Sequence, residues 1–416
     1  MEIKELTNAE FKAFSEQFSP SSMYQTLYYA LTMNKEDCDS FFVGLMDGNV
    51  LKAASLILVQ KISGFKYAFA PRGFLVNFSD NNLLETFTKL LKKYLKRKDI
   101  VAIKINPMII KSVYNENGEI IKENYEYNNI FENLKKLGYY HLGYNNYFEA
   151  LKPRYEAVVN IDLPYTQIFA NIEKPFRTKI RKSIKDGIKV YHGNIDNLDY
   201  LYLHTKNKYP RDLDYFKNLY ESFDKENLID FYYSKLDTTE YLKISQKKYT
   251  QYEKLANELN KKLMSSTGNN EKDMNKKILV DKEFEKAKNQ LAAATNYLRD
   301  YPDGIILASA LIVKWQSEVY LIIDGYDETY KNFNGKHLLL WKLMGRYSKL
   351  GYKRFNLGGV SNIQKPSKYK GLNEFKLNFN AKVIEYTGDY ELITNTPLYF
   401  MYRRSNNFNN MIKPGK

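Results

Sequence analysis

The sequence contains little cysteine and histidine and no long apolar run. Its single thiol, Cys38, excludes a disulfide framework and a metal site built from several thiolates, which favours a cytosolic protein. The longest uncharged apolar run, residues 304–313, is about half the length that crosses a bilayer, and residues 1–18 lack a signal-peptide core. We therefore expect any membrane contact to be peripheral. The four histidines lack metal-ligand spacing, so no metal site is expected: His141, His192, His204 and His337.

Basic and aromatic residues are abundant. The chain has 416 residues, a length that predicts two domains of common size and an accessory element. Its 37 Tyr and 24 Phe suffice for packed cores. A net charge of +15 predicts a surface that attracts polyanions, whether nucleic acid, nucleotide phosphates or an anionic membrane face.

Residues 41–105 predict a β-β-β-α-β block. Two strand-like segments, residues 41–45 and 51–60, flank the turn at Asp47-Gly48-Asn49, which is typical of a hairpin. A third strand is expected at residues 65–70. Apolar residues at helical spacing then predict a helix over residues 82–97, and a short buried strand follows at residues 100–105.

A similar order recurs near the other end of the chain. Strands are expected at residues 305–315, 319–325 and 354–357, with a helix over residues 335–350 that Gly351 ends. The repeated β-β-α-β order predicts two similar α/β domains. Gly335-Lys336 opens the second helix at a place where backbone N–H groups favour a phosphate or an anionic oxygen, as in N-acyltransferases of the acetyltransferase superfamily. A single glycine there disfavours coenzyme A.

Residues 238–300 predict an antiparallel two-helix coiled-coil arm, because both limbs carry apolar residues at heptad spacing and residues 265–270 between them predict a turn. Its lysines make contact with RNA phosphates possible, whereas a dimerisation or scaffold hairpin is the alternative interpretation. The apolar positions are Leu242, Ser245, Tyr249, Tyr252, Ala256, Leu259 and Leu263 on the first limb, and Val280, Phe284, Ala287, Leu291, Ala294 and Leu298 on the second.

Residues 173–190 form the most basic segment. Pro175 suits the first turn of a helix and Gly187 its end, so Arg177, Arg181 and Lys185 share one helix face. Like charges on one face repel one another, so this face either awaits a phosphate-rich partner or serves solubility.

Several local strings resemble the Fem family of peptidoglycan bridge-forming aminoacyltransferases, and the resemblance runs nearly end to end. The strings are Ala70-Pro71-Arg72-Gly73, Lys152-Pro153-Arg154-Tyr155, the basic segment with Gly187-Ile188-Lys189-Val190, Phe355-Asn356-Leu357-Gly358-Gly359, Gly371 with Phe375-Lys376, and residues 380–390. Members with an inserted arm act on the lipid-linked precursor lipid II, and the arm resembles the tRNA-binding arm of seryl-tRNA synthetases. Two departures are visible: Asn106-Pro107 where some members have an acidic residue before the proline, and Met33 where a lysine is expected, with Lys35 nearby.

The resemblance implies an α/β (α+β) fold of tandem acetyltransferase-like (GNAT-like) domains. We expect the first domain at residues 1–150, the second at residues 151–237 and 301–416, and the arm at residues 238–300, with the C-terminal tail able to pack on the first domain. The implied enzyme takes aminoacyl-tRNA as co-substrate and lipid II as acceptor, and needs no cofactor. It acts in the cytoplasm at the inner membrane face, with homo- or hetero-oligomers possible.

The reaction implied is attack of an amine on an aminoacyl ester, which requires positioning, proton acceptance and a cation for the oxyanion. Lys376, in the Phe-Lys string, is the first choice for a cation that faces the developing oxyanion or a substrate phosphate, and Phe375 would shape the peptide channel; a structural lysine on an exposed strand is the alternative. No activated Ser or Cys string is present, in line with direct transfer, and no general base is identified. Substrate-binding candidates are Arg72, Arg154, Arg177, Arg181, Asn356, Gly358 and Gly335.

Two rival functions remain open from the residues. A coenzyme A dependent N-acyltransferase of the same fold would bind acyl-coenzyme A at Gly335. A non-catalytic RNA-binding or assembly protein would keep the arm and not depend on Lys376.

Overall fold

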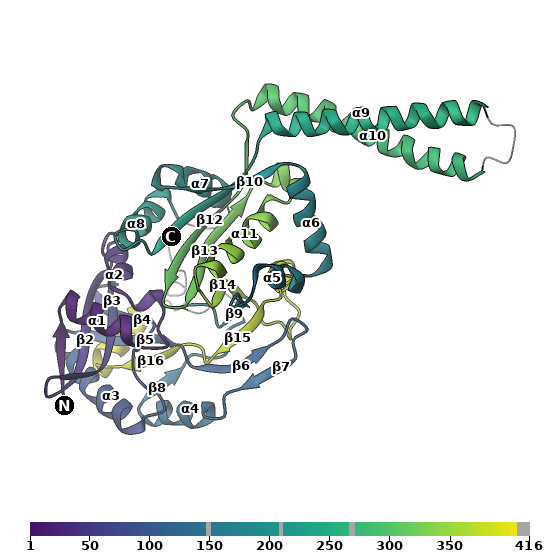
Figure 1. The fold of residues 1–416 in the computed structure, drawn as a ribbon. Coiled ribbons are helices and arrows are strands. Elements are labelled where there is room, and N and C mark those ends of the chain that lie inside the picture. The colour runs from purple at the N-terminus through teal and green to yellow at the C-terminus, as the bar shows by residue number, and fades with distance from the viewer. Residues whose placement is uncertain (147–150, 208–210, 266–270, 406–416) are drawn as a thin grey trace.

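The structure, a computed structural model, describes residues 1–146, 151–207, 211–265 and 271–405. Two mixed β-sheets lie side by side in the body of the molecule, and a pair of long helices projects from it (Figure 1). The expected turn of the arm falls at residues 265–270, most of which lie outside the described residues.

The first sheet has seven strands in the order β1-β2-β3-β4-β5-β16-β8. Their bounds are β1 Glu2–Leu6, β2 Asp39–Asp47, β3 Val50–Ile62, β4 Phe65–Arg72, β5 Ile100–Pro107, β8 Tyr139–His141 and β16 Tyr390–Ile393. The β2–β3 hairpin turns at Gly48, whose φ of +56° suits a glycine. After helix α3 (Asn81–Arg97) the chain returns parallel to β4 as β5, so the predicted block is confirmed.

The second sheet has nine strands in the order β10-β11-β12-β13-β14-β9-β15-β6-β7. Their bounds are β6 Ile110–Tyr114, β7 Ile120–Glu123, β9 Tyr155–Asn160, β10 Ile188–Gly193, β11 Ile229–Leu236, β12 Ile305–Trp315, β13 Glu318–Tyr326, β14 Arg354–Val360 and β15 Lys382–Tyr386. Here too a helix, α11 (Gly335–Lys349), separates two parallel strands: β14 follows the helix and runs parallel to β13 before it. The second predicted block is therefore also confirmed, and Gly351 ends its helix with a φ of +87°.

The sheets exchange strands across the expected division at residue 150. Strands β6 and β7 come from the first 150 residues but pair in the second sheet, through β15. In the opposite direction, β16 near the C-terminus pairs with β5 and β8 of the first sheet. The sequence division is therefore a coarse guide to the two lobes, because antiparallel partners far apart in sequence leave no local signal.

Helices cover the sheets and join the lobes. Their bounds are α1 Asn8–Gln17, α2 Leu27–Asn34, α3 Asn81–Arg97, α4 Tyr127–Lys136, α5 Tyr165–Asn171, α6 Lys174–Lys185, α7 Leu198–Thr205, α8 Leu213–Asp224, α9 Thr238–Ser265, α10 Glu271–Asp300, α11 Gly335–Lys349, α12 Lys370–Leu377 and α13 Thr396–Ser405. Helices α5, α6 and α11 pack in the core of the second sheet, and α3 and α4 in that of the first. A further core combines α1 and α2 with α7 and α8, which fixes one lobe against the other.

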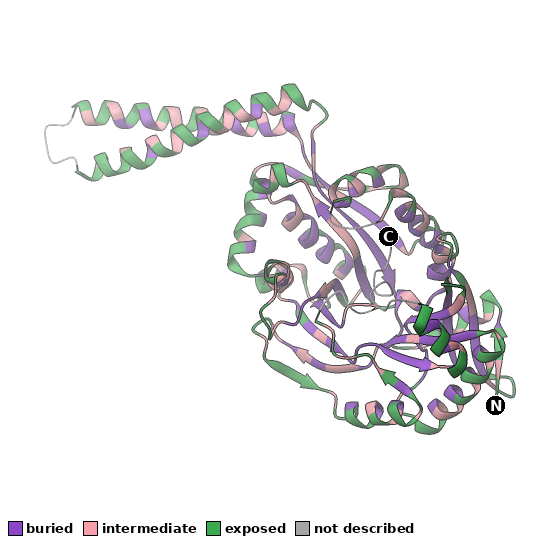
Figure 2. Ribbon diagram, turned by 180° about the vertical axis from the view of Figure 1, so that it is seen from behind, coloured by how far each residue is buried: buried purple, intermediate pink, exposed green. Residues whose placement is uncertain are grey.

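The arm consists of α9 and α10, which pack against each other along their lengths (Figure 1). Every heptad position predicted from the sequence is buried or half-buried, with Ala256, Ala287 and Ala294 among the most enclosed. Figure 2 shows that most other arm positions face solvent, whereas buried residues fill the strands of the body. Within the described ranges, no helix is both long and apolar enough to cross a bilayer.

Candidate functional site

The two parallel strands of the second lobe part at their C-terminal ends. Strand β13 pairs with β14 only over Glu318–Tyr320 and Arg354–Asn356. Farther along, β14 reaches Gly358 and Gly359, while β13 carries Asp324. Backbone groups released from a ladder in this way need other partners, and they become available to side chains or substrates.

Lys376 supplies one such partner. Its Nζ donates a hydrogen bond of 2.8 Å to the Gly359 carbonyl. Burial lowers the pKa of Lys376 to about 8, against the opposing effect of the Asp324 carboxylate. The residue lies on helix α12 and is half-buried, so the exposed strand expected in the alternative is wrong, whereas a structural role for Lys376 stays a prediction. At neutral pH Lys376 is a cation, but one close to titration.

A second cation lies beside this lysine. The Lys336 ammonium is 2.5 Å from Asp324 Oδ2 and 4.3 Å from the centre of the Phe375 ring. Phe375 also packs against Phe176 at 5.5 Å. The ring predicted to shape a peptide channel therefore belongs to an aromatic cluster that carries a paired ammonium on its face.

Neutral His337 completes the aromatic cluster. Its ring lies 4.5 Å from Phe176 and 5.2 Å from Phe375. Both ring nitrogens are buried without a hydrogen-bond partner among the described residues. Burial, together with Lys179 and Lys336, lowers the pKa of His337 to about 3, so the imidazole is uncharged at neutral pH.

Gly335 opens α11 as predicted, and packing explains the glycine. A Cβ atom there would lie 2.6 Å from Leu307 Cβ and 2.7 Å from Ser234 Oγ. The absent side chain lets the start of α11 approach strands β11 and β12 closely. The preceding Asn334 has a left-handed φ of +56° and forms no side-chain cap.

Arg72 and Asn356 belong to one buried polar network. Arg72 Nη2 donates to Glu156 Oε1 at 2.6 Å and to the Pro153 carbonyl at 2.7 Å. Asn356 Nδ2 donates to Glu156 Oε2 at 2.8 Å and to Glu318 Oε1 at 2.9 Å. The Asn356 side-chain oxygen accepts from the N–H of Gly358, whose φ is +77°. The network therefore sets the backbone beside Lys376.

Arg154 is the centre of a neighbouring network. Its Nη2 pairs with Glu385, which also accepts from Tyr114, and its Nε donates to the Tyr386 carbonyl at 3.3 Å. The side chain is 4% exposed, so its donors are directed at protein groups. Arg72 and Arg154, predicted to bind substrate, therefore use their side chains to link strands through Glu156 and Glu385.

Lys152 is a functional candidate that sequence reasoning missed. Its Nζ lies 3.6 Å from the centre of the Tyr24 ring. Burial lowers the pKa of Lys152 to about 7, and Arg72 and Arg211 lower it further while Glu156 raises it. A lysine with this pKa can accept a proton at neutral pH. The string Lys152-Pro153-Arg154-Tyr155 is the sequence signal at this place, but a sequence does not show which ammonium group the fold encloses.

Comparisons with known proteins identify the family of this chain. The model of the FemAB family matches residues 6–406. The chain belongs to the FemAB family. It is 25% identical to aminoacyltransferase FemA of Staphylococcus epidermidis over 97% of this chain and 98% of that protein. It is 28% identical to lipid II:glycine glycyltransferase of Staphylococcus haemolyticus, over 96% and 94% of the two chains.

A solved structure supports the fold. The crystal structure of FemX superposes with a TM-score of 0.76 at 21% identity, covering 96% of this chain and 99% of that one. The predicted FemAB membership, fold class and aminoacyltransferase class are thereby confirmed.

The structure shows the surroundings of the two residues that depart from the FemAB pattern, Asn106 and Met33. Asn106 Nδ2 donates to Asp389 Oδ1 at 2.6 Å, so a carboxylate from a distant segment stands beside the amide. Met33 packs in the core between the lobes, and Lys35 pairs with Glu221 at 2.7 Å. Lys35 is therefore already engaged by the other lobe.

The arginines of the basic helix α6 are more exposed to solvent than the buried Arg72 and Arg154. Helix α6 ends before Gly187, whose φ is +78°. Arg181 is exposed and lies 5.2 Å from the centre of the Phe169 ring. Arg177 is half-buried and donates to the Ala170 carbonyl at 3.3 Å, and its Nε has no hydrogen-bond partner in the described part of the chain. Arg181 is thus the freer of these two predicted phosphate contacts.

Proposed function

We propose that this protein transfers an aminoacyl group from aminoacyl-tRNA to an amine of lipid II, and so builds the peptidoglycan interpeptide bridge. The observation that carries the proposal is the FemAB match over residues 6–406, since it spans both lobes and the arm together. The names of the relatives support an aminoacyl donor and a lipid II acceptor.

The chemistry of the proposal is direct ester aminolysis. The acceptor nitrogen bonds to the carbonyl carbon, and the bond from that carbon to the ribose oxygen of the tRNA breaks. The nitrogen loses a proton and the departing oxygen gains one. In the proposal, the Lys376 ammonium faces the oxyanion that develops on the carbonyl oxygen.

Proton transfer falls to the second lysine in this proposal. Lys152 has a pKa of about 7, so in about half of the protein molecules its side chain is a free amine at neutral pH. The Glu156 carboxylate raises the pKa of both Lys152 and Lys376, which supports placing the two lysines around one carboxylate.

The arm is the proposed contact for tRNA. Lys243, Lys247 and Lys254 follow one face of α9, are exposed, and form no ion pair with the described residues. Reversing these three charges should weaken tRNA binding at least tenfold and flatten its salt dependence. Reversing Lys272, Lys282 and Lys288 of α10 is the matched control. An effect on self-association with unchanged tRNA binding would favour the dimerisation hairpin.

The proposal places the protein at the cytoplasmic face of the membrane as a peripheral protein, where the lipid anchor holds the acceptor. A net charge of +15 suits an anionic surface. Association with itself or with related transferases is compatible with this position.

Transfer is tested with purified protein, lipid II and a pool of charged tRNAs, followed by mass measurement of the lipid product. The expected result is a gain of one amino-acid residue, whose mass identifies the donor. A parallel arm with acetyl-coenzyme A should give no product. No gain with any tRNA pool would favour the non-catalytic RNA-binding protein, and acetylation would favour the coenzyme A dependent enzyme.

A further inference from the structure

The hydrogen bond from Lys376 ends on strand β14 at a bulge. The pairing of β14 with β9 is regular up to Asn356, and it resumes with a shifted register at Gly359. A bulge turns the neighbouring backbone groups in a new direction, and bulges are common beside active sites. The carbonyl that accepts from Lys376 at 2.8 Å belongs to Gly359, where the pairing resumes.

Gly358 lies inside this bulge, next to the ammonium. Its φ of +77° favours glycine. A Cβ atom at this position would lie 3.7 Å from Lys376 Nζ and 3.6 Å from the carbonyl oxygen of Leu321 on β13. A shift of this backbone would therefore move both the neighbour of the ammonium and the carbonyl to which it donates.

Asn356 holds the bulge from the side of the strand. Its Oδ1 accepts from the N–H of Gly358 at 2.8 Å. This N–H lies where the ladder with β9 is interrupted, so the side-chain oxygen replaces a strand partner. Asn356 is 2% exposed, and its amide acts on the bulge from inside the protein.

Two carboxylates fix the orientation of the Asn356 amide. Its Nδ2 donates to Glu156 Oε2 at 2.8 Å and to Glu318 Oε1 at 2.9 Å. An amide nitrogen only donates and a carboxylate only accepts, so the reverse orientation would set the Asn356 oxygen against two carboxylates. The oxygen is thereby held toward the N–H of Gly358.

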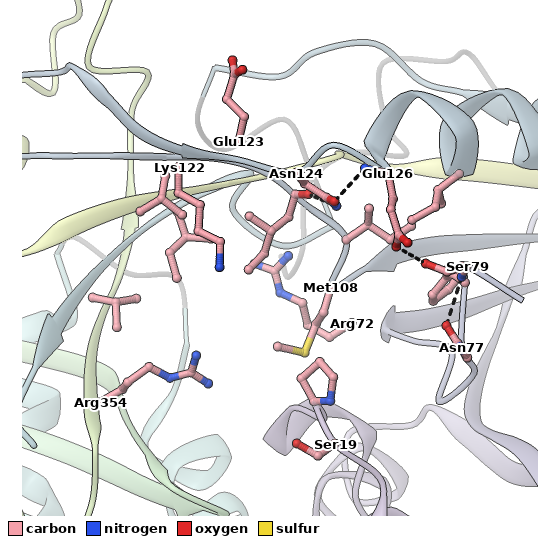
Figure 3. A pocket seen from close by; sticks show the side chains of 18 of the residues that line it. Ser19, Arg72, Asn77, Ser79, Met108, Lys122, Glu123, Asn124, Glu126 and Arg354 are labelled. Atoms are coloured by element: carbon pink, nitrogen blue, oxygen red, sulfur yellow. Dashed lines mark hydrogen bonds between the residues drawn. The ribbon is translucent and has the colours of Figure 1, made fainter.

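Two arginines hold the other oxygens of these carboxylates. Arg72 Nη2 donates to Glu156 Oε1 at 2.6 Å, and Arg354 Nη2 lies 2.7 Å from Glu318 Oε2. Both arginines line a pocket of about 1340 Å³ that has walls from both lobes, and Figure 3 shows their side chains there. Arg72 belongs to β4 of the first lobe and Arg354 to β14 of the second, so both lobes set the position of Asn356.

Asn373 holds the same stretch of backbone from helix α12. Its Oδ1 accepts from the N–H of Ser361 at 3.0 Å. Its Nδ2 donates to the Ser361 carbonyl at 3.2 Å and to Ser361 Oγ at 2.9 Å. Asn373 is 7% exposed and lies three residues before Lys376, so the two side chains share a face of α12.

We propose that Asn356 and Asn373 are positioning residues, which hold residues 358–361 from the strand and from the helix and so direct Lys376 at the reacting ester. This inference rests on the proposed function, because it assumes that Lys376 acts on that ester. An ammonium has three N–H bonds, and donation of one to Gly359 restricts the directions of the other two. A displacement of about 1 Å at a reacting centre can lower a rate about 10²-fold.

The first test is single-turnover transfer by Asn356→Ala and Asn373→Ala. The rate should fall about tenfold or more in both variants, because Lys376 is no longer directed. The lipid II concentration that gives half of the maximal rate should change less than about twofold, since neither asparagine contacts substrate in this proposal. A full rate in Asn373→Ala, or a change confined to the half-saturating concentration, would overturn the proposal. Asn373→Ala keeps the test decisive if Asn356→Ala does not fold.

Asn194→Ala is the matched control. Asn194 Oδ1 accepts from the N–H of Asp196 at 3.1 Å, two residues farther along, as Asn356 does from Gly358. Asn194 is exposed between β10 and α7, on neither β14 nor α12. This variant should transfer at the rate of the original protein. A loss equal to that of the other two variants would overturn the proposal.

The second test is the titration of Lys376, which a purely structural role would not change. A carbonyl that accepts from an ammonium favours its charged form, so loss of the Gly359 bond should bring the pKa of Lys376 below about 8. The NMR signal of the labelled, dimethylated lysine should titrate at lower pH in Asn356→Ala and Asn373→Ala than in Asn194→Ala. A slower rate with an unchanged titration would make the two asparagines structural only, and would overturn the proposal.

Failure of this inference is distinguishable from failure of the proposed function. The titration of Lys376 is measured without substrate and does not depend on transfer. No product from the original protein with any pool of charged tRNA would end the proposed function, whatever the titration shows. Transfer by the original protein, with equal rates in all three variants, would end this inference alone.

Discussion

Two buried arginines and two half-buried lysines differ in what their charges do. Arg72 and Arg154 pair directly with Glu156 and Glu385. Lys152 and Lys376 have no carboxylate in direct contact among the described residues, and burial lowers the pKa of both. The arginines are held by carboxylates, whereas the lysines have lowered pKa values and are the ones that we propose act on a substrate.

The largest expected effect is a loss of folding stability when a buried arginine is replaced. Arg154→Met leaves Glu385 buried without its main partner and should destabilise the protein by about 3–5 kcal/mol. Urea unfolding measures the difference. Arg181→Met, at an exposed position, should change stability by less than about 0.5 kcal/mol. Similar losses in the two variants would show that Arg154 is not a structural pair.

Replacing one of the lysines should lower the transfer activity and leave the folding stability unchanged. Lys376→Met removes the proposed oxyanion cation and should lower the rate of transfer about 10²–10³-fold. Single-turnover transfer to lipid II gives the rate, and thermal unfolding gives the control. Full activity in this variant would remove Lys376 from the mechanism.

Gly335 tests whether the start of α11 is limited by packing. Gly335→Ala forces a methyl group against Leu307 and Ser234 and should cost about 1–3 kcal/mol. Gly371→Ala on α12 has no atom within 4 Å of the added carbon and should not destabilise the protein. A stable Gly335→Ala variant would reopen this helix start as a place for an anion.

The smallest expected effect is a pH dependence of stability. Lys152 has a pKa of about 7 in the folded protein and 10.5 as its ordinary value, so the unfolded chain binds more protons between these pH values. Stability should therefore rise between pH 7 and 9, by at most roughly 2 kcal/mol and by less to the extent that solvent screens this half-buried ammonium. Urea midpoints at both pH values measure the rise, and Lys152→Met should reduce it. An unchanged slope would mean that this lysine titrates normally.

Much of the fold was predictable because its signals are local. The turn at Gly48, the helix end at Gly351 and the heptads of the arm each depend on residues close in sequence, and each appears where expected. The crossing of β6 and β7 into the second sheet was not predictable, since β15, the strand that joins β6 to that sheet, lies more than 250 residues away along the chain.

The site was predictable in residue type but not in role. Family strings led to Arg72, Arg154 and Lys376, yet the partners of the arginines, Glu156 and Glu385, belong to other strands and carry no motif. The role of Lys152 was not predictable because its lowered pKa comes from burial against Tyr24 and proximity to Arg72, which only the folded chain brings together.

Direct titration of the two lysines tests the central claim. With all lysines dimethylated using labelled carbon, NMR should show one signal that titrates near pH 7 and disappears in Lys152→Met. A second should titrate near pH 8 and disappear in Lys376→Met, and both should shift when aminoacyl-tRNA and lipid II bind. Ordinary lysine titration near pH 10.5 at both positions would contradict the account.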